Sequence, residues 1–179
     1  DGGVDRVAHR ERVTVVSPNE NLGFAAGCNL GVRHARGATI VLLNCDAIVE
    51  PTALSELVWV ARRDEVGIAT ASVRLAGAPD SLNSAGNAIH FTGFSWSGCF
   101  NELASAHAEE RDAFAASGAA MAMRREVWDA LGGFDEHYFA YYEDADLSVR
   151  CWQHGWTIRY VPHAVVLHRY EFSRHDSKL

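Results

Sequence analysis

The residues best suited to acid–base chemistry are three carboxylates within four positions, Glu143, Asp144 and Asp146. They precede a run, at about 144–154, that has the apolar spacing of a helix. Acids in a first helical turn interact favourably with the helix dipole, by about 0.3–1 kcal/mol each. We therefore expect Asp144 at the N-cap and Asp146 in the first turn. Three acids exceed what capping needs, and a carboxylate kept ionised by helix amides could also act as a general base.

A second candidate lies where an apolar run ends, in "LLNCD" at 42–46. In open α/β sheets, ligands bind outside the carboxyl ends of the strands, and residues two apart project to the same side. Asn44 and Asp46 would then face one crevice. A lone carboxylate there suits a hard divalent cation that shares diphosphate oxygens. The spacing alone favours the simpler interpretation, an aspartate that caps a turn.

Two further signals are weaker. In "NENLGFAAGCN" (19–29), Gly23 and Gly27 permit close backbone approach at the start of a helix, which is a common anion site. A glycine-bearing turn without a ligand explains the same residues equally well. His168 follows the apolar run "AVVL", and a histidine in that position is more often structural than a ligand.

The elements that must position these residues begin with alternating strands and helices. Apolar β-branched runs predict strands, and apolar residues three or four apart predict helices. The expected elements are a strand at 13–17, a helix at 24–36, a strand from 38 to the polar residues at Asn44, a helix at 52–64 and a strand at 67–75. Such alternation is typical of a parallel sheet covered by helices.

Beyond residue 75 the pattern changes. The Gly-, Ser- and Asn-rich segment 76–101 predicts loops with small antiparallel strands. The remaining expected elements are a strand at 116–123, a helix at 125–133, the helix after the acid cluster, and two final strands at 157–162 and 164–170. Without an internal repeat or a linker, residues 1–179 are predicted to form a single domain.

The amino-acid composition limits the classes of binding partner and the compartment that we expect for this chain. Of the 179 residues 48% are hydrophobic, which is enough for a core. The net charge of −7, with no basic stripe, argues against nucleic acid. The four cysteines have no CxxC spacing, so we expect buried free thiols in a reducing, cytoplasmic compartment. We find neither a signal peptide nor an apolar run long enough to span a bilayer.

Taken together and in this order, the motifs resemble the family 2 glycosyltransferases of the rhamnosyltransferase-like or cell-wall type. The segments that carry the resemblance are "NENLGFAAGCNLGVRHARG", "IVLLNCDAIVEP", "SAGNAIHFTG", "SGAAMAMRREVWDALGGFDEHYFAYYEDADLSVRCWQHGW" and "YVPHAVVLH". It implies an α/β, GT-A (Rossmann-like) fold: a mostly parallel sheet flanked by helices, with a small antiparallel acceptor-side portion. Residues 1–75 would form a partial nucleotide-sugar-binding half, and 76–179 the acceptor-binding and catalytic-base half.

The resemblance also implies a donor site. Asn44-Cys45-Asp46 stands where the family has its DxD-type motif, with asparagine replacing the first acid. Asp46 is then the implied ligand of Mg²⁺ or Mn²⁺, and His168 joins it at the metal or the diphosphate. Asn44 would contact the donor sugar or ribose. The segment that lines the donor site is matched by Asn21, Gly23 and Asn29.

On the acceptor side, Asp144 matches the general base of the family's ED motif, and the other residues expected there are Gly118, Tyr142 and Glu143. The implied reaction is an inverting transfer from a UDP- or dTDP-sugar to a hydroxyl of a glycan or lipid-linked acceptor, in polysaccharide or cell-wall synthesis. Asp144 would take the acceptor's proton, and the metal would neutralise the leaving diphosphate. Association with the inner face of a membrane is left open.

Family members begin with a strand and loop that cradle the nucleotide base, whereas this chain begins at "DGG", about where that region ends. We therefore expect an N-terminally truncated sheet with an exposed edge that favours self-association. The alternative to a transferase is a fragment of the same fold that binds glycan, or takes part in assembly, without catalysis. Donor binding separates the two interpretations, because a nucleotide sugar stabilises only a chain that has a donor site.

Overall fold

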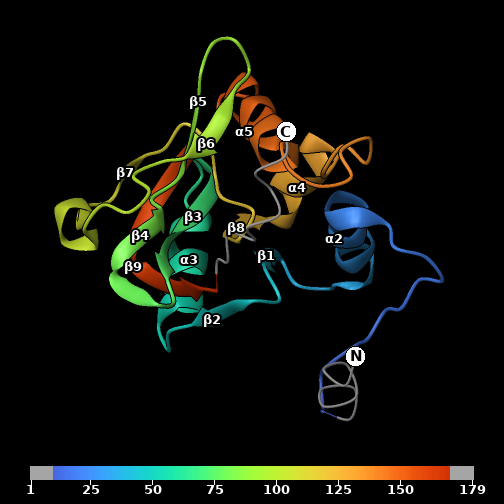
Figure 1. Cartoon of the computed structure of the whole chain (residues 1–179). Coiled ribbons are helices and arrows are strands. Elements are labelled where there is room, and N and C mark those ends of the chain that lie inside the picture. The colour runs from blue at the N-terminus through green and yellow to red at the C-terminus, as the bar shows by residue number, and fades with distance from the viewer. Residues whose placement is uncertain (1–9, 170–179) are drawn as a thin grey trace, which may run out of the picture.

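The computed structural model describes residues 10–169 as a central sheet with helices on both faces (Figure 1). The sheet has the strand order β1-β8-β3-β9-β2, with β4 paired to β3 and β7 paired to β9. Its strands are β1 (Thr39–Leu43), β2 (Ala47–Val49), β3 (Val66–Leu75), β4 (Ala78–Ser84), β7 (Arg111–Asp112), β8 (Ala120–Arg124) and β9 (Thr157–His168). The helices are α2 (Gly23–His34), α3 (Ala53–Ala61), α4 (Arg125–Leu131), α5 (Glu143–Gln153) and the 3-10 turn η1 (Ala104–His107).

The strands of the sheet's core run mostly in one direction. β3 and β9 pair in parallel from Val66 to Leu75. β8 runs antiparallel to both β1 and β3, so β1, β3 and β9 all point the same way. The predicted α/β class, the mostly parallel core and the small antiparallel portion, a hairpin of β5 (Asn87–Ile89) and β6 (Ser95–Ser97), are confirmed.

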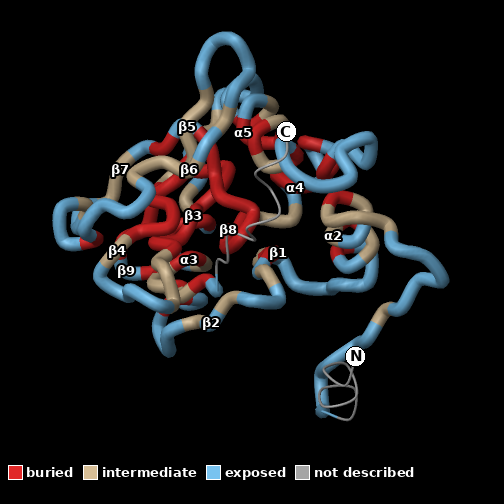
Figure 2. The backbone as a smooth tube through the Cα atoms, in the orientation of Figure 1, coloured by how far each residue is buried: buried red, intermediate tan, exposed pale blue. Residues whose placement is uncertain are grey.

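Two hydrophobic clusters hold the helices to the sheet. One joins α3, through Leu57 and Val60, to alanines and valines of β3, β8 and β9. The other joins α2, α4 and α5 to the opposite side of the sheet, through Val32, Trp128 and Leu147 among others. Figure 2 shows the buried backbone concentrated along β3 and β8, between these layers. Every helix among residues 10–169 is too short or too polar to traverse a bilayer.

Two strand predictions were wrong. Residues 13–17 form no strand, and Val13 and Val15 are exposed on a segment that extends away from the sheet (Figure 1). A β-branched run becomes a strand only where a partner strand and a packed face are available. The two strands predicted near the C-terminus form one strand, β9, in which residues 162–164 bulge between the pairs Ala71–Val161 and Ser72–Val165. Pro162 has no N–H for the ladder, and a bulge tolerates this.

The start of α5 also differs from the prediction. Tyr142, not Asp144, is the N-cap, with φ of 71°, and Tyr141 has φ of 69°. Asp144 therefore lies inside the first turn. Two consecutive non-glycine residues in the left-handed region are strained by about 1–3 kcal/mol each, and such strain concentrates at functional sites.

Candidate active site

A cavity of about 550 Å³ lies where β1 and β9 end and α5 begins. This is the carboxyl edge of the sheet's parallel strands, where α/β folds bind ligands. Six of the predicted site residues line it, drawn from segments far apart in the chain: Asn44, Gly118, Tyr142, Glu143, Asp144 and His168. Of the three residues expected to share one cleft, Asp144 and His168 line this cavity. Asp46, the third, does not line it, but its Oδ1 lies 3.1 Å from His168 Nε2.

Asp144 is held by donors from three segments. Its Oδ2 accepts hydrogen bonds from the Gly118 backbone N–H at 2.9 Å and from Asn87 Nδ2 at 3.2 Å. Its Oδ1 accepts one from the Ala145 N–H at 2.8 Å. These contacts hold the carboxylate in one orientation, at the wall of the cavity.

Burial raises the pKa of Asp144 above the usual range of an aspartate, and the backbone N–H groups of Gly118 and Ala145 oppose that shift. A carboxylate with a raised pKa is a stronger base once it is ionised, which suits proton abstraction from a hydroxyl. The geometry and the electrostatics of Asp144 both fit the general-base role.

Glu143 is the more buried member of the pair, with 5% of its surface exposed. Burial is the main cause that raises the pKa of Glu143, and the Asp144 charge adds to it. Among the described residues its Oε2 has no hydrogen-bond partner, although its side chain lines the cavity. A buried polar atom without a partner costs free energy, which sets Glu143 apart from the well-bonded Asp144 beside it.

His168 lies close to three polar side chains of the site. Asn83 Oδ1 lies 3.0 Å from its Nδ1, and Asp46 Oδ1 lies 3.1 Å from its Nε2. Asn44 Nδ2 is 3.4 Å from the same Nε2. If Asn83 accepts the Nδ1 proton, a neutral ring presents its Nε2 lone pair toward Asp46.

The backbone explains why these residues meet. Pairing of β2 with β9 places Ala47 opposite His168, and the Arg169 N–H donates to the Asp46 carbonyl at 3.1 Å. The Asn44 N–H donates to the Ala119 carbonyl at 3.0 Å, which joins the end of β1 to the loop that carries Gly118. Residues more than 120 positions apart are thus brought together by strand register.

These residues fit a divalent cation. A carboxylate oxygen and an imidazole nitrogen stand 3.1 Å apart, and a neutral His168 would face Asp46 with a lone pair. The buried Asn44 Oδ1 beside them has no hydrogen-bond partner among the described residues. Carboxylate and amide oxygens suit Mg²⁺ and Mn²⁺, and an imidazole is a common metal ligand.

The predicted donor-segment residues lie outside the cavity and support it. Asn21 Oδ1 accepts the Gly23 N–H at 3.0 Å, and the next N–H, of Phe24, donates to the Phe139 carbonyl at 2.7 Å. Asn29 is buried: its Nδ2 donates to the Phe134 carbonyl at 2.9 Å, and its Oδ1 accepts the Phe134 N–H at 3.0 Å. α2 is thereby fastened to the loop that leads to Tyr141.

Two asparagines in contact with the site were missed by the sequence analysis. Asn83 orients His168, and Asn87 donates to Asp144. Both come from "SLNSAGN" (81–87), a segment without periodicity; Asn87 lies inside the quoted motif "SAGNAIHFTG", whereas Asn83 lies just before it. Asn87 is placed by reciprocal backbone hydrogen bonds with Ala115, at 2.7 and 3.0 Å.

Comparison with curated proteins identifies relatives over part or most of the chain. An N-acetylglucosaminyl-diphospho-decaprenol L-rhamnosyltransferase of Mycobacterium tuberculosis is 50% identical over 52 residues, covering 29% of this chain and 17% of the relative. The O-antigen biosynthesis protein RfbC of Myxococcus xanthus is 29% identical over 171 residues, covering 91% of this chain and 13% of the relative. The chain therefore spans less than a fifth of the length of either protein.

Solved structures share the fold. GalNAc-T7 with UDP, GalNAc and Mn²⁺ superposes with a TM-score of 0.71 at 18% identity, over 86% of this chain and 32% of that one. A mannosyltransferase of Pyrobaculum calidifontis with GDP-Man and Mn²⁺ superposes with a TM-score of 0.61 at 17% identity. The match covers 90% of this chain and 40% of the mannosyltransferase. Both support the GT-A architecture. The model of the family "Glycosyltransferase like family 2" matches residues 3–178, so the chain belongs to this glycosyltransferase family.

Proposed function

We propose that the site transfers a sugar from a nucleotide diphosphate sugar to an acceptor hydroxyl, with inversion at the anomeric carbon. The observation that carries the proposal is the shared cavity: the Asp144 carboxylate lines the same hollow as Asn44 and His168, beside Asp46. A base and a cation-binding pair at one cavity are what such a displacement requires.

In this mechanism Asp144 accepts the proton of the acceptor hydroxyl, whose oxygen attacks the anomeric carbon from the face opposite the diphosphate. The hydrogen bonds from Gly118 and Asn87 hold the Asp144 carboxyl group in one orientation while it takes up the proton. Asp46 and His168 would hold Mg²⁺ or Mn²⁺. When bound, the cation supplies charge neutralisation to the departing diphosphate. Asn44, which lines the cavity, would contact the donor sugar or ribose.

The donor and acceptor classes follow from chemistry and from the relatives. A UDP- or dTDP-sugar is the proposed donor; the structural relatives hold UDP in one case and GDP-Man in the other. A glycan or lipid-linked sugar is the proposed acceptor, since the mycobacterial relative is named for a diphospho-decaprenol acceptor. Exposed rings at the cavity, from Trp96, Tyr141 and Tyr142, are suited to pack on pyranose faces.

The proposed function is tested by substituting Asp144, the proposed general base. Asp144→Asn keeps the shape of the side chain but removes its basicity, so turnover falls by about 10²–10⁴ while donor affinity is largely retained. Turnover is measured as nucleotide release and product formation with a panel of lipid-linked acceptors, and donor affinity by calorimetry. Asp146→Asn is the matched control: the Asp146 carboxylate lies 2.6 Å from Arg150, so turnover should stay within a few-fold of wild type.

Full transferase activity in Asp144→Asn would overturn the assignment of the base. Donor binding without turnover in the wild type, with every acceptor in the panel, would favour a non-catalytic binding role for this cavity. Absence of donor binding as well would contradict the donor site itself.

A further inference from the structure

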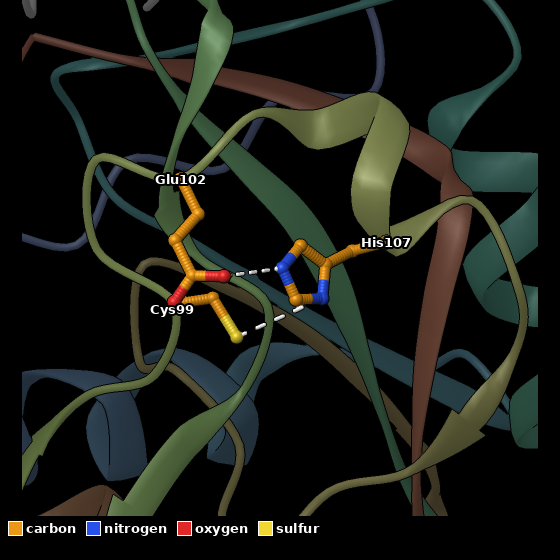
Figure 3. A group of neighbouring side chains, drawn as sticks. All are labelled: Cys99, Glu102 and His107. Carbon is orange, nitrogen blue, oxygen red and sulfur yellow. Dashed lines mark hydrogen bonds and ion pairs between the residues drawn. The ribbon is translucent and has the colours of Figure 1, made fainter.

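A second group of ligating side chains lies away from the cavity, in the segment between β6 and β7. The ligand atoms of Cys99, Glu102 and His107 all lie within 4.8 Å of one another (Figure 3). None of the three residues lines the candidate active site. Their chemistry, a thiol, a carboxylate and an imidazole, is that of a transition-metal site.

The imidazole stands between its two neighbours. His107 Nε2 is 2.7 Å from Glu102 Oε2, and His107 Nδ1 is 3.8 Å from Cys99 Sγ (Figure 3). If Glu102 accepts the Nε2 proton of a neutral ring, the Nδ1 lone pair points at the sulfur. Arg111 Nη2 lies 3.7 Å from the same sulfur and favours the thiolate, whereas burial and the Glu102 charge raise the pKa of Cys99.

The backbone holds this group in place. The Glu102 N–H donates to the Cys99 carbonyl at 3.1 Å, which closes a turn. Reciprocal hydrogen bonds of 2.8 Å, from Asn101 N–H to Leu82 and from Leu82 N–H to Glu102, fasten the turn to β4. His107 ends η1, whose first residue Ala104 is buried. The three side chains therefore start from fixed Cα positions and need only side-chain movement to converge.

The distances fit zinc. With Zn–S near 2.3 Å and Zn–N near 2.0–2.1 Å, tetrahedral geometry puts sulfur and nitrogen about 3.5 Å apart. The Sγ–Nδ1 separation of 3.8 Å is within a few tenths of an ångström of that value. The Glu102 side chain is 56% exposed and free to rotate toward an ion beside the sulfur. One ion takes one ring nitrogen, so His107 gives up one of its two present contacts.

We propose that Cys99, Glu102 and His107 bind one Zn²⁺ ion, with the fourth coordination position open to water. A thiolate and a carboxylate balance the charge of the ion, and cysteine, histidine and glutamate are each known zinc ligands. The site is separate from the donor cation at Asp46 and His168.

The position of this site gives it a structural role. A neighbouring cavity of about 350 Å³ is lined by Cys99, His107 and Arg111, and also by Asn87 and Trp96. Asn87 and Trp96 line the candidate active site as well. A Zn²⁺ ion at Cys99, Glu102 and His107 would therefore stabilise the positions of Asn87 and Trp96 in the wall of the candidate active site.

The test uses Co²⁺ as a probe with the whole, reduced and chelator-treated chain. A thiolate ligand gives Co²⁺ an intense near-ultraviolet charge-transfer band, and Zn²⁺ should displace it at one equivalent. The band should be lost in Cys99→Ser, and affinity should fall roughly 10–100-fold or more in Glu102→Gln and His107→Asn. Cys28→Ser is the matched control, because Cys28 is a free thiol that belongs to neither proposed metal site. Asp46→Asn should leave the band unchanged, which separates the two metal sites.

A wild-type chain that is folded by circular dichroism but gives no band would overturn the proposal. So would a band of equal strength in Cys99→Ser. If Cys99→Ser fails to fold, the other two ligand variants decide, since unchanged Co²⁺ affinity in both would exclude the site.

Discussion

At the scale of the residue, hydrogen bonding distinguishes two of the three carboxylates in the first turn of α5, Asp144 and Asp146. Asp144 is held by three donors at the cavity wall, whereas Asp146 is paired with Arg150. Two aspartates in one helical turn therefore have different surroundings, which agrees with the proposed role of Asp144 as the base and gives Asp146 a contact within the helix. Their hydrogen-bond partners decide how each carboxylate is oriented, and burial raises the pKa of Asp144.

The first prediction concerns Asn87. Its Nδ2 donates to Asp144 Oδ2 and so favours the ionised form of the base. Asn87→Ala removes that donor, raises the pKa of Asp144 further, and moves the acid limb of the kcat–pH profile to higher pH. Turnover depends on the ionised base, so it falls at neutral pH, by less than the roughly 10²–10⁴-fold expected when the base itself is removed.

The comparison variant is Asn83→Ala, which contacts His168 rather than Asp144. It should change the Mn²⁺ dependence of turnover and leave the acid limb in place. An acid limb that does not move in Asn87→Ala would show that Asn87 acts on packing and not on the base.

Sequence reasoning reached part of the site at this scale. Asn44, Asp144 and His168 were assigned to the site from the family resemblance, and all three line the cavity, whereas Asp46, assigned in the same way, does not. Asn83 and Asn87 were not found, because their roles exist only through contacts with His168 and Asp144, 85 and 57 positions away. A segment without periodicity contains no local signal for such contacts.

At the scale of the element, the start of α2 is fitted closely to the loop before α5. Gly23 has φ of +78°, and a Cβ there would lie 2.2 Å from the Phe139 carbonyl oxygen. A Cβ at Gly27, in the same helix, would have no such neighbour within 4 Å. The two glycines therefore differ sharply in what a side chain would meet.

The second prediction follows from that difference. Gly23→Ala should cost about 1–3 kcal/mol, because it combines backbone strain with a clash, and should lower the melting temperature and the turnover together. Gly27→Ala should be neutral or stabilise by up to about 1 kcal/mol, because alanine favours an exposed helical position. Thermal unfolding followed by circular dichroism gives both values, and equal melting temperatures for the two variants would contradict this account.

Element prediction from sequence succeeded where periodicity was strong. α2, α3, β3 and α5 lie within a few residues of their predicted positions. The run at 13–17 has the composition of a strand, but composition does not specify a partner strand. The bulge in β9 was not predictable either, since it depends on pairing with β3.

At the scale of the whole molecule, donor binding should be linked to stability and to the cation. A donor at 100 times its dissociation constant stabilises the folded chain by about 2.7 kcal/mol. The third prediction is that UDP-, dTDP- or GDP-sugars raise the melting temperature more with Mn²⁺ than after chelation. Asp46→Asn should lose the Mn²⁺-dependent part of the shift. Equal shifts with and without Mn²⁺ in the wild type would exclude cation-assisted donor binding.

The bulge of β9 has a consequence for how this fold tolerates change in chain length. Side chains alternate across a strand, so a slip of one residue turns every following side chain to the opposite face. Deleting exposed His163 from the bulge should rotate His168 away from Asp46 while the pairs before Val161 stay in register. Removing the exposed tip residue Gly93, between β5 and β6, should leave His168 in place. The orientation of the His168 imidazole therefore depends on the number of residues in the bulge.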